Sequence, residues 1–241
     1  DYSWSPDGKW FTLEFIGNRH DPYSDIGMVS AQGGKIINLT NSGYTSGSPR
    51  WVLDGNAILF ITERYGMRAH ASWGSLNDVM LVFMNQDAYD KFRLSKEDYE
   101  LQKELEKEQK DTTETKKNDK KKGDNKEKSE EKKEEKVKDI VVELNNIEDR
   151  IVRLTPNSSD LGSAIITKDG ETLYYLSAFE GGYDLWKMNL RKKDTKLLHK
   201  MDAGWANMEM DKDGKNLFLL GSNTMQKMGT DSESLKPISY Q

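Results

Sequence analysis

The stretch that decides the fold is Tyr2-Ser-Trp-Ser-Pro-Asp-Gly-Lys-Trp-Phe-Thr-Leu-Glu-Phe-Ile16. It has the pattern of a β-hairpin. Pro6, Asp7 and Gly8 are turn residues, because glycine tolerates a positive φ and the aspartate side chain can accept hydrogen bonds from nearby backbone N–H groups. Alternating apolar residues follow the turn, as in a half-buried strand. One such turn indicates only a hairpin, so its copies carry the fold prediction.

Three weaker copies of this stretch follow, and their turns are Asp54-Gly55, Asp169-Gly170 and Asp213-Gly214. The first two turns are about 47 residues apart and the last two about 44, a spacing typical of repeat architectures. The middle gap is longer by about 70 residues, which predicts an insertion. The first stretch and its first two copies are each followed by an aspartate that begins another strand, namely Asp25, Asp78 and Asp184. A pair of residues then closes a further strand; the pairs are Leu39-Thr40, Leu154-Thr155 and Leu197-Leu198. A hairpin and two more strands per repeat predict a four-stranded β-propeller blade.

The composition is uneven along the chain. Of 241 residues, 35% are hydrophobic and 32% are charged, and most of the charge lies between Asp87 and Lys138. The formal net charge of -5 gives no reason to expect a nucleic acid as partner. With no cysteine there is no disulfide or thiol chemistry, and no apolar run is long enough for a membrane span. The sequence begins inside a repeat and without methionine, so we expect it to be a piece of a longer protein.

The repeats predict an all-β segment of four blades, an open arc of a larger propeller. Blade one is expected at residues 1–45, blade two at 46–155, blade three at 156–200 and blade four at 201–241. Blade two contains the insertion, residues 86–138, with a helix at about 96–109 that Ser95 would cap. Residues 110–136 have almost no apolar side chains and are expected to be disordered. The side chains predicted to be buried between sheets are Trp4, Trp51, Phe60, Leu173, Tyr175, Leu217 and Leu219.

The loop after the second strand of blade two supplies the candidate peptide-binding residues. Arg64, Arg68, His70 and Trp73 are residue types that bind carboxylates and stack on ligands. The alternative is that the arginines pair with neighbouring acids and that Trp73 packs on the next blade. In a propeller this loop lies on the face shared with the links between blades, where His20, Tyr23 and Tyr183 are also expected.

No catalytic, metal or cofactor site is predicted. His70 and Ser72 lack a third group to orient them as base and nucleophile. A metal loop at His20 and Asp21 lacks further ligands, and the turn that begins at Asp211 lacks the later carboxylates of a calcium loop.

Two groups of residues resemble known families. The Trp4-Ser5-Pro6-Asp7-Gly8-Lys9 hairpin, with Asp25-Ile26 and Leu39-Thr40, resembles the TolB-like propeller repeat. The stretch Arg64-Tyr-Gly-Met-Arg-Ala-His-Ala-Ser-Trp-Gly74, the charged insertion after it and Glu148-Asp-Arg-Ile-Val-Arg-Leu-Thr155 look like the second, seven-bladed propeller of bacterial tricorn-like serine proteases. In that family the propeller is thought to filter or channel peptides toward PDZ-like and protease modules. None of the family's protease residues can be placed on this chain.

The resemblance leaves two functions open. The first is an accessory propeller that orients peptides for a downstream PDZ-like and serine-protease module; the second is a free-standing, TolB-like protein-interaction propeller. A metal-dependent lyase is disfavoured because no set of converging ligands is evident. The partners implied are peptides or unfolded polypeptide and the modules of a parent chain, whose oligomeric state stays open. The resemblance favours the periplasm and leaves the cytoplasm open.

Overall fold

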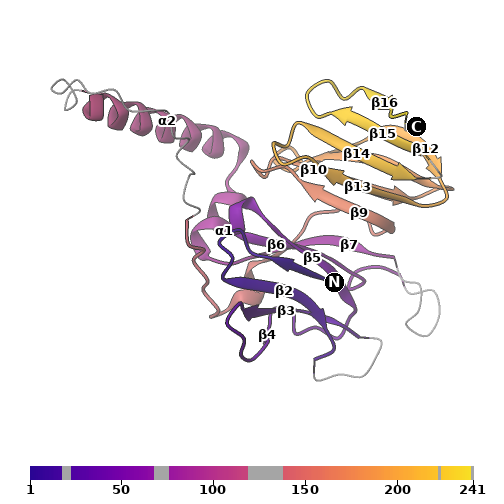
Figure 1. The fold of residues 1–241 in the computed structure, drawn as a ribbon, viewed down its shortest axis with the longest axis horizontal. Helices are drawn as coiled ribbons and strands as arrows, with labels where there is room; N and C mark the ends of the chain where they lie inside the picture. The colour runs from indigo at the N-terminus through magenta and orange to yellow at the C-terminus, as the bar shows by residue number, and fades with distance from the viewer. Residues whose placement is uncertain (18–22, 68–75, 119–137, 222–223, 240–241) are drawn as a thin grey trace.

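The computed structural model describes residues 1–17, 23–67, 76–118, 138–221 and 224–239, and these form four successive antiparallel sheets (Figure 1). The first sheet comprises β1 (Tyr2–Trp4), β2 (Trp10–Phe15), β3 (Asp25–Ser30) and β4 (Ile37–Asn38). The second comprises β5 (Ser46–Val52), β6 (Ala57–Thr62), β7 (Asp78–Phe83) and β8 (Ile151–Arg153). The third comprises β9 (Asp160–Ile166), β10 (Thr172–Ala178), β11 (Tyr183–Asn189) and β12 (Asp194–Ala203). The fourth comprises β13 (Ala206–Met210), β14 (Asn216–Gly221), β15 (Thr224–Gly229) and β16 (Leu235–Pro237).

Strands pair in chain order within every sheet, which is the arrangement of propeller blades and confirms the predicted all-β class. One blade boundary differs from the prediction. Strand β12 continues past residue 200, because Tyr183 still pairs with Ala203, so blade three ends at Ala203.

Each blade has two ends with different connections. The turn face carries the Asp-Gly turns, residues 5–9, 53–56, 167–171 and 211–215. The link face carries the loops between second and third strands and the links between blades; among the described residues these are 16–17, 23–24, 39–45, 63–67, 76–77, 154–159, 179–182 and 204–205. The insertion leaves from the end of β7, where Phe83 pairs with Ala57, so its first described residues begin at the turn face.

The glycines of the four turns all have a positive φ, of +67° at Gly8, +87° at Gly55, +70° at Gly170 and +72° at Gly214. In the first turn, Asp7 accepts hydrogen bonds from the Ser5 hydroxyl and the Lys9 N–H. Asp169 makes the same pair of bonds in the third turn, with Thr167 and Glu171. The other two turns differ. Residues Leu53–Gly55 form a 3-10 turn, and in blade four the carboxylate that bonds the backbone belongs to Asp211 rather than Asp213.

The aspartates and threonines of the repeated Asp and Leu-Thr motifs connect the third strand of a blade to the end of its outer strand. Asp25 accepts a hydrogen bond of 2.7 Å from the Thr40 hydroxyl, and Asp78 accepts one of 2.8 Å from Thr155. Both aspartates are buried. Each threonine oxygen in turn accepts the backbone N–H that follows the aspartate. The sequence signals are therefore the two halves of one clasp, which satisfies polar groups that burial would otherwise destabilise.

Three apolar cores lie between consecutive blades. Phe60 and Trp51 of blade two face Met28 of blade one, Tyr175 and Leu173 of blade three face blade two, and Leu217 and Leu219 of blade four face blade three. Six of the seven residues predicted to be buried lie in these cores, Trp51 being only half-buried.

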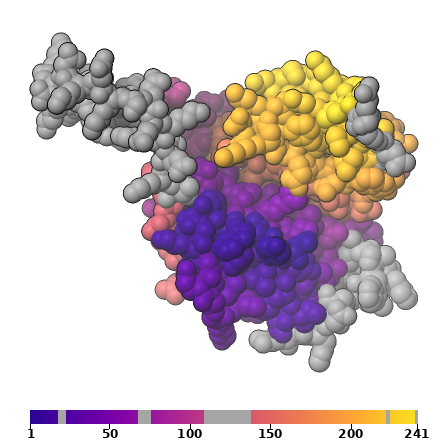
Figure 2. Space-filling model, in the orientation of Figure 1, coloured from indigo at the N-terminus to yellow at the C-terminus, as the bar shows by residue number. Residues whose placement is uncertain are grey.

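The prediction for Trp4 is wrong. Its side chain is 53% exposed and packs on Phe11 in a tilted arrangement, with ring centroids 3.6 Å apart. In the other three blades the equivalent sheet face packs on the preceding blade, but no sheet of the described chain covers this face of blade one. Figure 2 shows blade one, in indigo, uncovered on the side toward the viewer.

The insertion begins with two helices, α1 (Gln86–Arg93) and α2 (Lys96–Asn118). The sequence prediction missed α1, which Asn85 caps by accepting the Ala88 N–H. Helix α2 begins where expected, with the Asp98 N–H bonded to the Ser95 hydroxyl oxygen, but it continues nine residues past Gln109. The expected disorder is therefore wrong for residues 110–118; the rest of that prediction, residues 119–136, lies outside the described residues.

Arg150 fixes the point where the insertion returns to blade two. Its side chain is buried within the short helix η2 (Ile147–Arg150), and its guanidinium donates to the backbone carbonyls of Phe83, Asn145 and Glu143. A planar guanidinium offers five N–H donors in a fixed geometry, which suits a set of converging carbonyls. One side chain thus connects the end of β7 to the segment that leads into β8.

Candidate ligand-binding face

The loop after β6 has a closed stem. The Leu76 N–H donates to the Met67 carbonyl at 3.1 Å, and the Gly66 N–H donates to the Glu63 carbonyl. A β-carbon on Gly66 would lie 1.7 Å from the Leu76 carbonyl oxygen, so the two sides of the stem can approach this closely only at a glycine. The stem holds Arg64 and Tyr65 at the surface of the link face.

Tyr65 lies between two arginines. The Arg64 guanidinium is 5.6 Å from the ring centroid and that of Arg153 is 5.1 Å away. Arg153 is held in place by Asp78, which accepts from its Nε and Nη2 atoms at 3.0 and 2.8 Å. Because the Asp78 carboxylate is buried and also bonds Ser158 and Thr155, it positions Arg153 from below. The Tyr65 ring remains 49% exposed, so an aromatic surface flanked by cationic groups faces solvent.

Polar contacts connect this stem to blade three. Asn77 and Ser159 exchange backbone hydrogen bonds, and the Ser177 hydroxyl donates to the Ser159 hydroxyl at 2.5 Å. Strand β10 ends immediately after Ser177, and the next loop presents the exposed ring of Phe179. The link face is therefore continuous from blade two to blade three.

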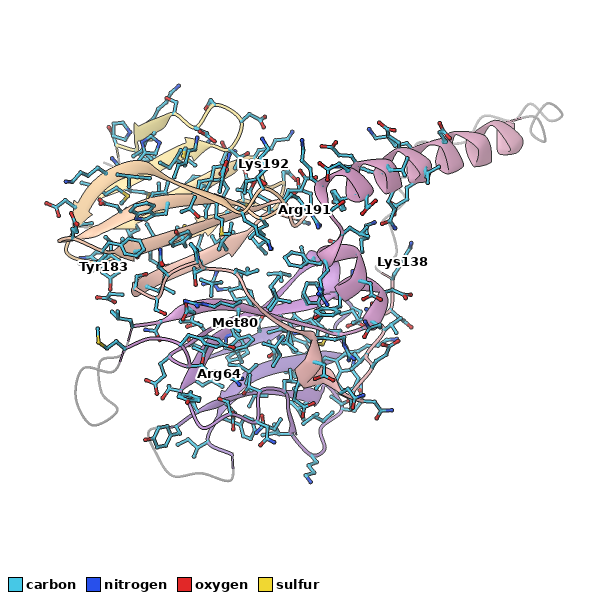
Figure 3. The ribbon with its side chains drawn as sticks, turned by 180° about the vertical axis from the view of Figure 1, so that it is seen from behind. Arg64, Met80, Lys138, Tyr183, Arg191 and Lys192 are labelled. Atoms are coloured by element: carbon cyan, nitrogen blue, oxygen red, sulfur yellow. The ribbon has the colours of Figure 1, made fainter. Side chains whose placement is uncertain are left out.

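Tyr183 is anchored on the same face. Its hydroxyl donates to Asp160 at 2.8 Å, and burial, together with this hydrogen bond to a carboxylate, raises the pKa of Tyr183 to about 12. The phenol thus stays protonated at neutral pH and acts as a donor. Beside it, Gly162 lies against the Ala206 carbonyl, next to Trp205, whose ring is 49% exposed in the link to blade four. Figure 3 shows Arg64 and Tyr183 on the side of the molecule away from Lys138 and Arg191.

The structure describes only part of the predicted site. Arg64 lies on the link face, as do Tyr23 and Tyr183, whereas Arg68, His70, Trp73 and His20 lie outside the described residues. The Arg64 side chain is exposed and lies over Tyr65, and no ion pair to a described acid holds it.

Three exposed or positioning residues of this face were missed by the sequence reasoning, namely Arg153, Phe179 and Trp205. Phe179 has a sequence signal, because it follows β10 just as the Arg64 loop follows β6. Trp205 stands in a link between blades, which is another signal of the same face. Arg153 has none, because only the folded chain brings it beside Tyr65.

The exposed groups of this face are of kinds that bind ligands. Among the described residues, no three His, Asp or Glu side chains are grouped so that they could hold a metal ion. Exposed aromatic rings and guanidinium groups bind apolar side chains, carboxylates and backbone carbonyls.

Comparison with solved structures identifies the architecture. The tricorn protease structure superposes with a TM-score of 0.62 at 10% identity, and the match covers 99% of this chain and 22% of that one. The chain is a β-propeller segment. TolB from Acinetobacter baumannii superposes on the propeller segment with a TM-score of 0.54 at 14% identity, over 99% of this chain and 43% of that one.

A curated sequence relative matches a shorter stretch of the propeller segment. The uncharacterized peptidase YuxL of Bacillus subtilis (strain 168) is 39% identical over 59 residues, which are 24% of this chain and 9% of that protein. No family model matches the chain. The segment thus spans about a fifth of tricorn protease and under half of TolB. Within the described residues, no helix has the length and apolar character needed to cross a membrane.

Proposed function

We propose that this propeller segment binds extended polypeptide on its link face and orients it for a peptidase module of the same parent protein. The observation that carries the proposal is the exposed Tyr65 ring between Arg64 and Arg153. Phe179 in blade three and Trp205 in the link to blade four add further exposed aromatic rings to the same face. The proposal includes three features that come from the family resemblance. They are the filtering role, the serine-protease chemistry and the PDZ-like neighbouring module.

Physical complementarity supports a polypeptide as the ligand. A peptide offers carbonyl oxygens and a terminal carboxylate to arginines, and apolar side chains to aromatic rings. Arg153 is fixed by a buried carboxylate and Tyr183 by Asp160, so both are already ordered before a ligand binds. Because these side chains are ordered before the ligand binds, the entropic cost of binding is lower.

A free-standing protein-interaction propeller is the second candidate. Its support is the superposition on TolB, which is a likeness of fold. Both functions use the same face, and they differ in whether a peptidase activity depends on that face.

The first test compares two substrates in the full-length parent protein. We expect Arg64→Ala with Tyr65→Ala to lower kcat/KM for a long peptide about fivefold, because the lost cation-aromatic surface is worth about 1 kcal/mol. The same double variant should leave kcat/KM for a minimal fluorogenic substrate unchanged, since a short substrate does not reach the propeller.

The matched control is Arg93→Ala, which removes an arginine that lies 5.3 Å from the Tyr89 ring on the turn face. This control should behave like the wild type with both substrates. Equal losses for both substrates in the double variant would indicate a structural role for the pair. Unchanged kcat/KM for the long peptide would exclude the link face from the substrate path, and a parent without peptidase activity would favour the interaction propeller.

A further inference from the structure

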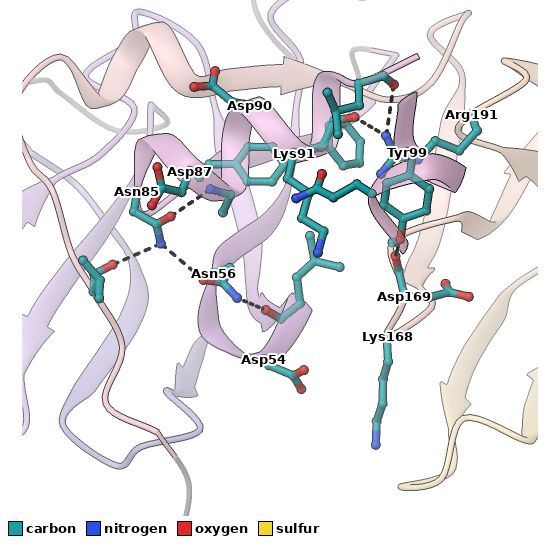
Figure 4. A pocket seen from close by; sticks show the side chains of 18 of the residues that line it. Asp54, Asn56, Asn85, Asp87, Asp90, Lys91, Tyr99, Lys168, Asp169 and Arg191 are labelled. Atoms are coloured by element: carbon teal, nitrogen blue, oxygen red, sulfur yellow. Dashed lines mark hydrogen bonds between the residues drawn. The ribbon is translucent and has the colours of Figure 1, made fainter. Parts of the chain in front are cut away.

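A second surface lies at the opposite end of the molecule from the link face. An open cavity of about 860 Å³ is lined by the turn of blade two, the turn of blade three and the two insertion helices (Figure 4). This volume is within the range of about 300–1,000 Å³ that is typical of ligand sites. Phe83 of the inter-blade core is buried but lies behind the cavity wall, and α1 and the corner after it contribute the partly buried Phe92 and Leu94 to the lining.

Blade three holds the helices that form the cavity wall. Arg191, in the turn after β11, donates from Nη1 to the Phe92 carbonyl, and its guanidinium lies 4.0 Å from the Tyr99 ring centroid. The Tyr99 hydroxyl donates to the Asp169 carbonyl at 3.3 Å. Lys103 of α2 donates to Glu171 at 2.6 Å, and this hydrogen bond raises the pKa of Lys103. Contacts from two turns of blade three, residues 167–171 and the turn that contains Arg191, thus hold the first turns of α2 against this blade.

Some charged side chains of the cavity wall have protein partners and others do not. Lys91 bonds Glu106 at 2.6 Å and Lys168 donates to the Lys212 carbonyl, so these cations, like Arg191, already have protein partners. Asp90 accepts from Gln86. Asp54 and Asp87, by contrast, are exposed at the cavity and have no hydrogen-bond or ion-pair partner among the described residues. The surface that remains available therefore combines an apolar floor with unpaired carboxylates.

We propose that this cavity is a docking site for a basic, apolar polypeptide segment, in which a leucine or phenylalanine side chain enters the cavity and a flanking lysine or arginine pairs with Asp54 and Asp87. Charge complementarity selects this occupant: an acidic segment would meet uncompensated carboxylates, and a purely apolar one would leave the carboxylates at the rim without a counter-charge. The site lies on the turn face, so it is separate from the proposed peptide path on the link face. A cation-bearing protein segment could thus be bound without obstructing that path.

The test measures the binding of a short labelled peptide to the 241-residue chain. In this peptide leucine and phenylalanine alternate with lysine, and the fluorescence anisotropy of the label reports the binding. Saturable binding that weakens with rising salt is expected. Asp54→Asn with Asp87→Asn should weaken the binding about three- to tenfold, because two exposed ion pairs are lost. Val141→Trp should also weaken it, because Val141 is exposed at the cavity and a larger side chain there would fill the space.

The matched control is Asp213→Asn, which removes an exposed carboxylate of the same face in the blade-four turn, away from the cavity. It should bind like the wild type. Peptides with glutamate for lysine, or alanine for the apolar residues, should bind at least about tenfold more weakly. Equal binding of the alanine peptide or of spermine would replace the proposal with a simple cation site. No saturable binding, or binding unchanged in both cavity variants, would overturn it.

Discussion

Arg150→Met is expected to lower the free energy of unfolding by about 3–5 kcal/mol, because it removes the guanidinium donors of one buried and two part-buried hydrogen bonds to backbone carbonyls. The Arg150 side chain is only 4% exposed and donates to the carbonyl oxygens of Phe83, Asn145 and Glu143. Methionine fills a similar volume but has no N–H, so these oxygens would lose a partner without creating a large cavity. Urea unfolding followed by tryptophan fluorescence measures the change.

Arg150→Lys and Arg93→Ala separate this explanation from a general charge effect. The lysine variant keeps the charge but loses the planar fork of donors, so an intermediate loss is expected. Arg93 is exposed on α1, and its removal should change the free energy of unfolding by less than about 0.5 kcal/mol. If Arg150→Met unfolded at the same urea concentration as the wild type, water or a relaxed backbone would be satisfying the carbonyls, and Arg150 would not anchor the insertion.

Tyr175→Ala is expected to cost about 3–5 kcal/mol, the usual loss for removing a large aromatic side chain from a core. Tyr175 is 1% exposed, packs between blades two and three, and stacks on Trp186 with ring centroids 6.5 Å apart. Burial also raises the pKa of its hydroxyl to about 12. The cavity left behind would lie at the contact between two blades, so the two halves of the segment should separate more easily. Thermal unfolding by circular dichroism tests this expectation.

Tyr2→Ala provides the matched control, because Tyr2 is a tyrosine of an inner strand whose side chain is 74% exposed. Its removal should change the free energy of unfolding by less than about 0.5 kcal/mol. Tyr175→Phe should cost far less than Tyr175→Ala, since the ring remains in place. Similar losses for Tyr2→Ala and Tyr175→Ala would contradict the assignment of the core to the contact between blades.

Several features of the structure were predictable because their causes are local. A glycine at positive φ after an aspartate defines a tight turn, and alternating apolar residues define a strand with one buried face. The four glycines have that φ, and the strands begin next to them. The cap of α2 at Ser95 is equally local, since one hydroxyl and the N–H of Asp98 are three residues apart.

The sequence by itself therefore determined the blades, their order and the place of the insertion, because the turns and strand patterns that mark them are local. Only the tertiary structure decided which faces are covered. Trp4 and Trp51 occupy equivalent positions, yet another blade packs beside Trp51 and none of the described chain covers Trp4. Likewise, Arg153 meets Asp78 and Tyr65, and Arg191 meets Phe92 and Tyr99, across separations of many residues. Such contacts leave no periodic signal, because they depend on how distant segments are brought together.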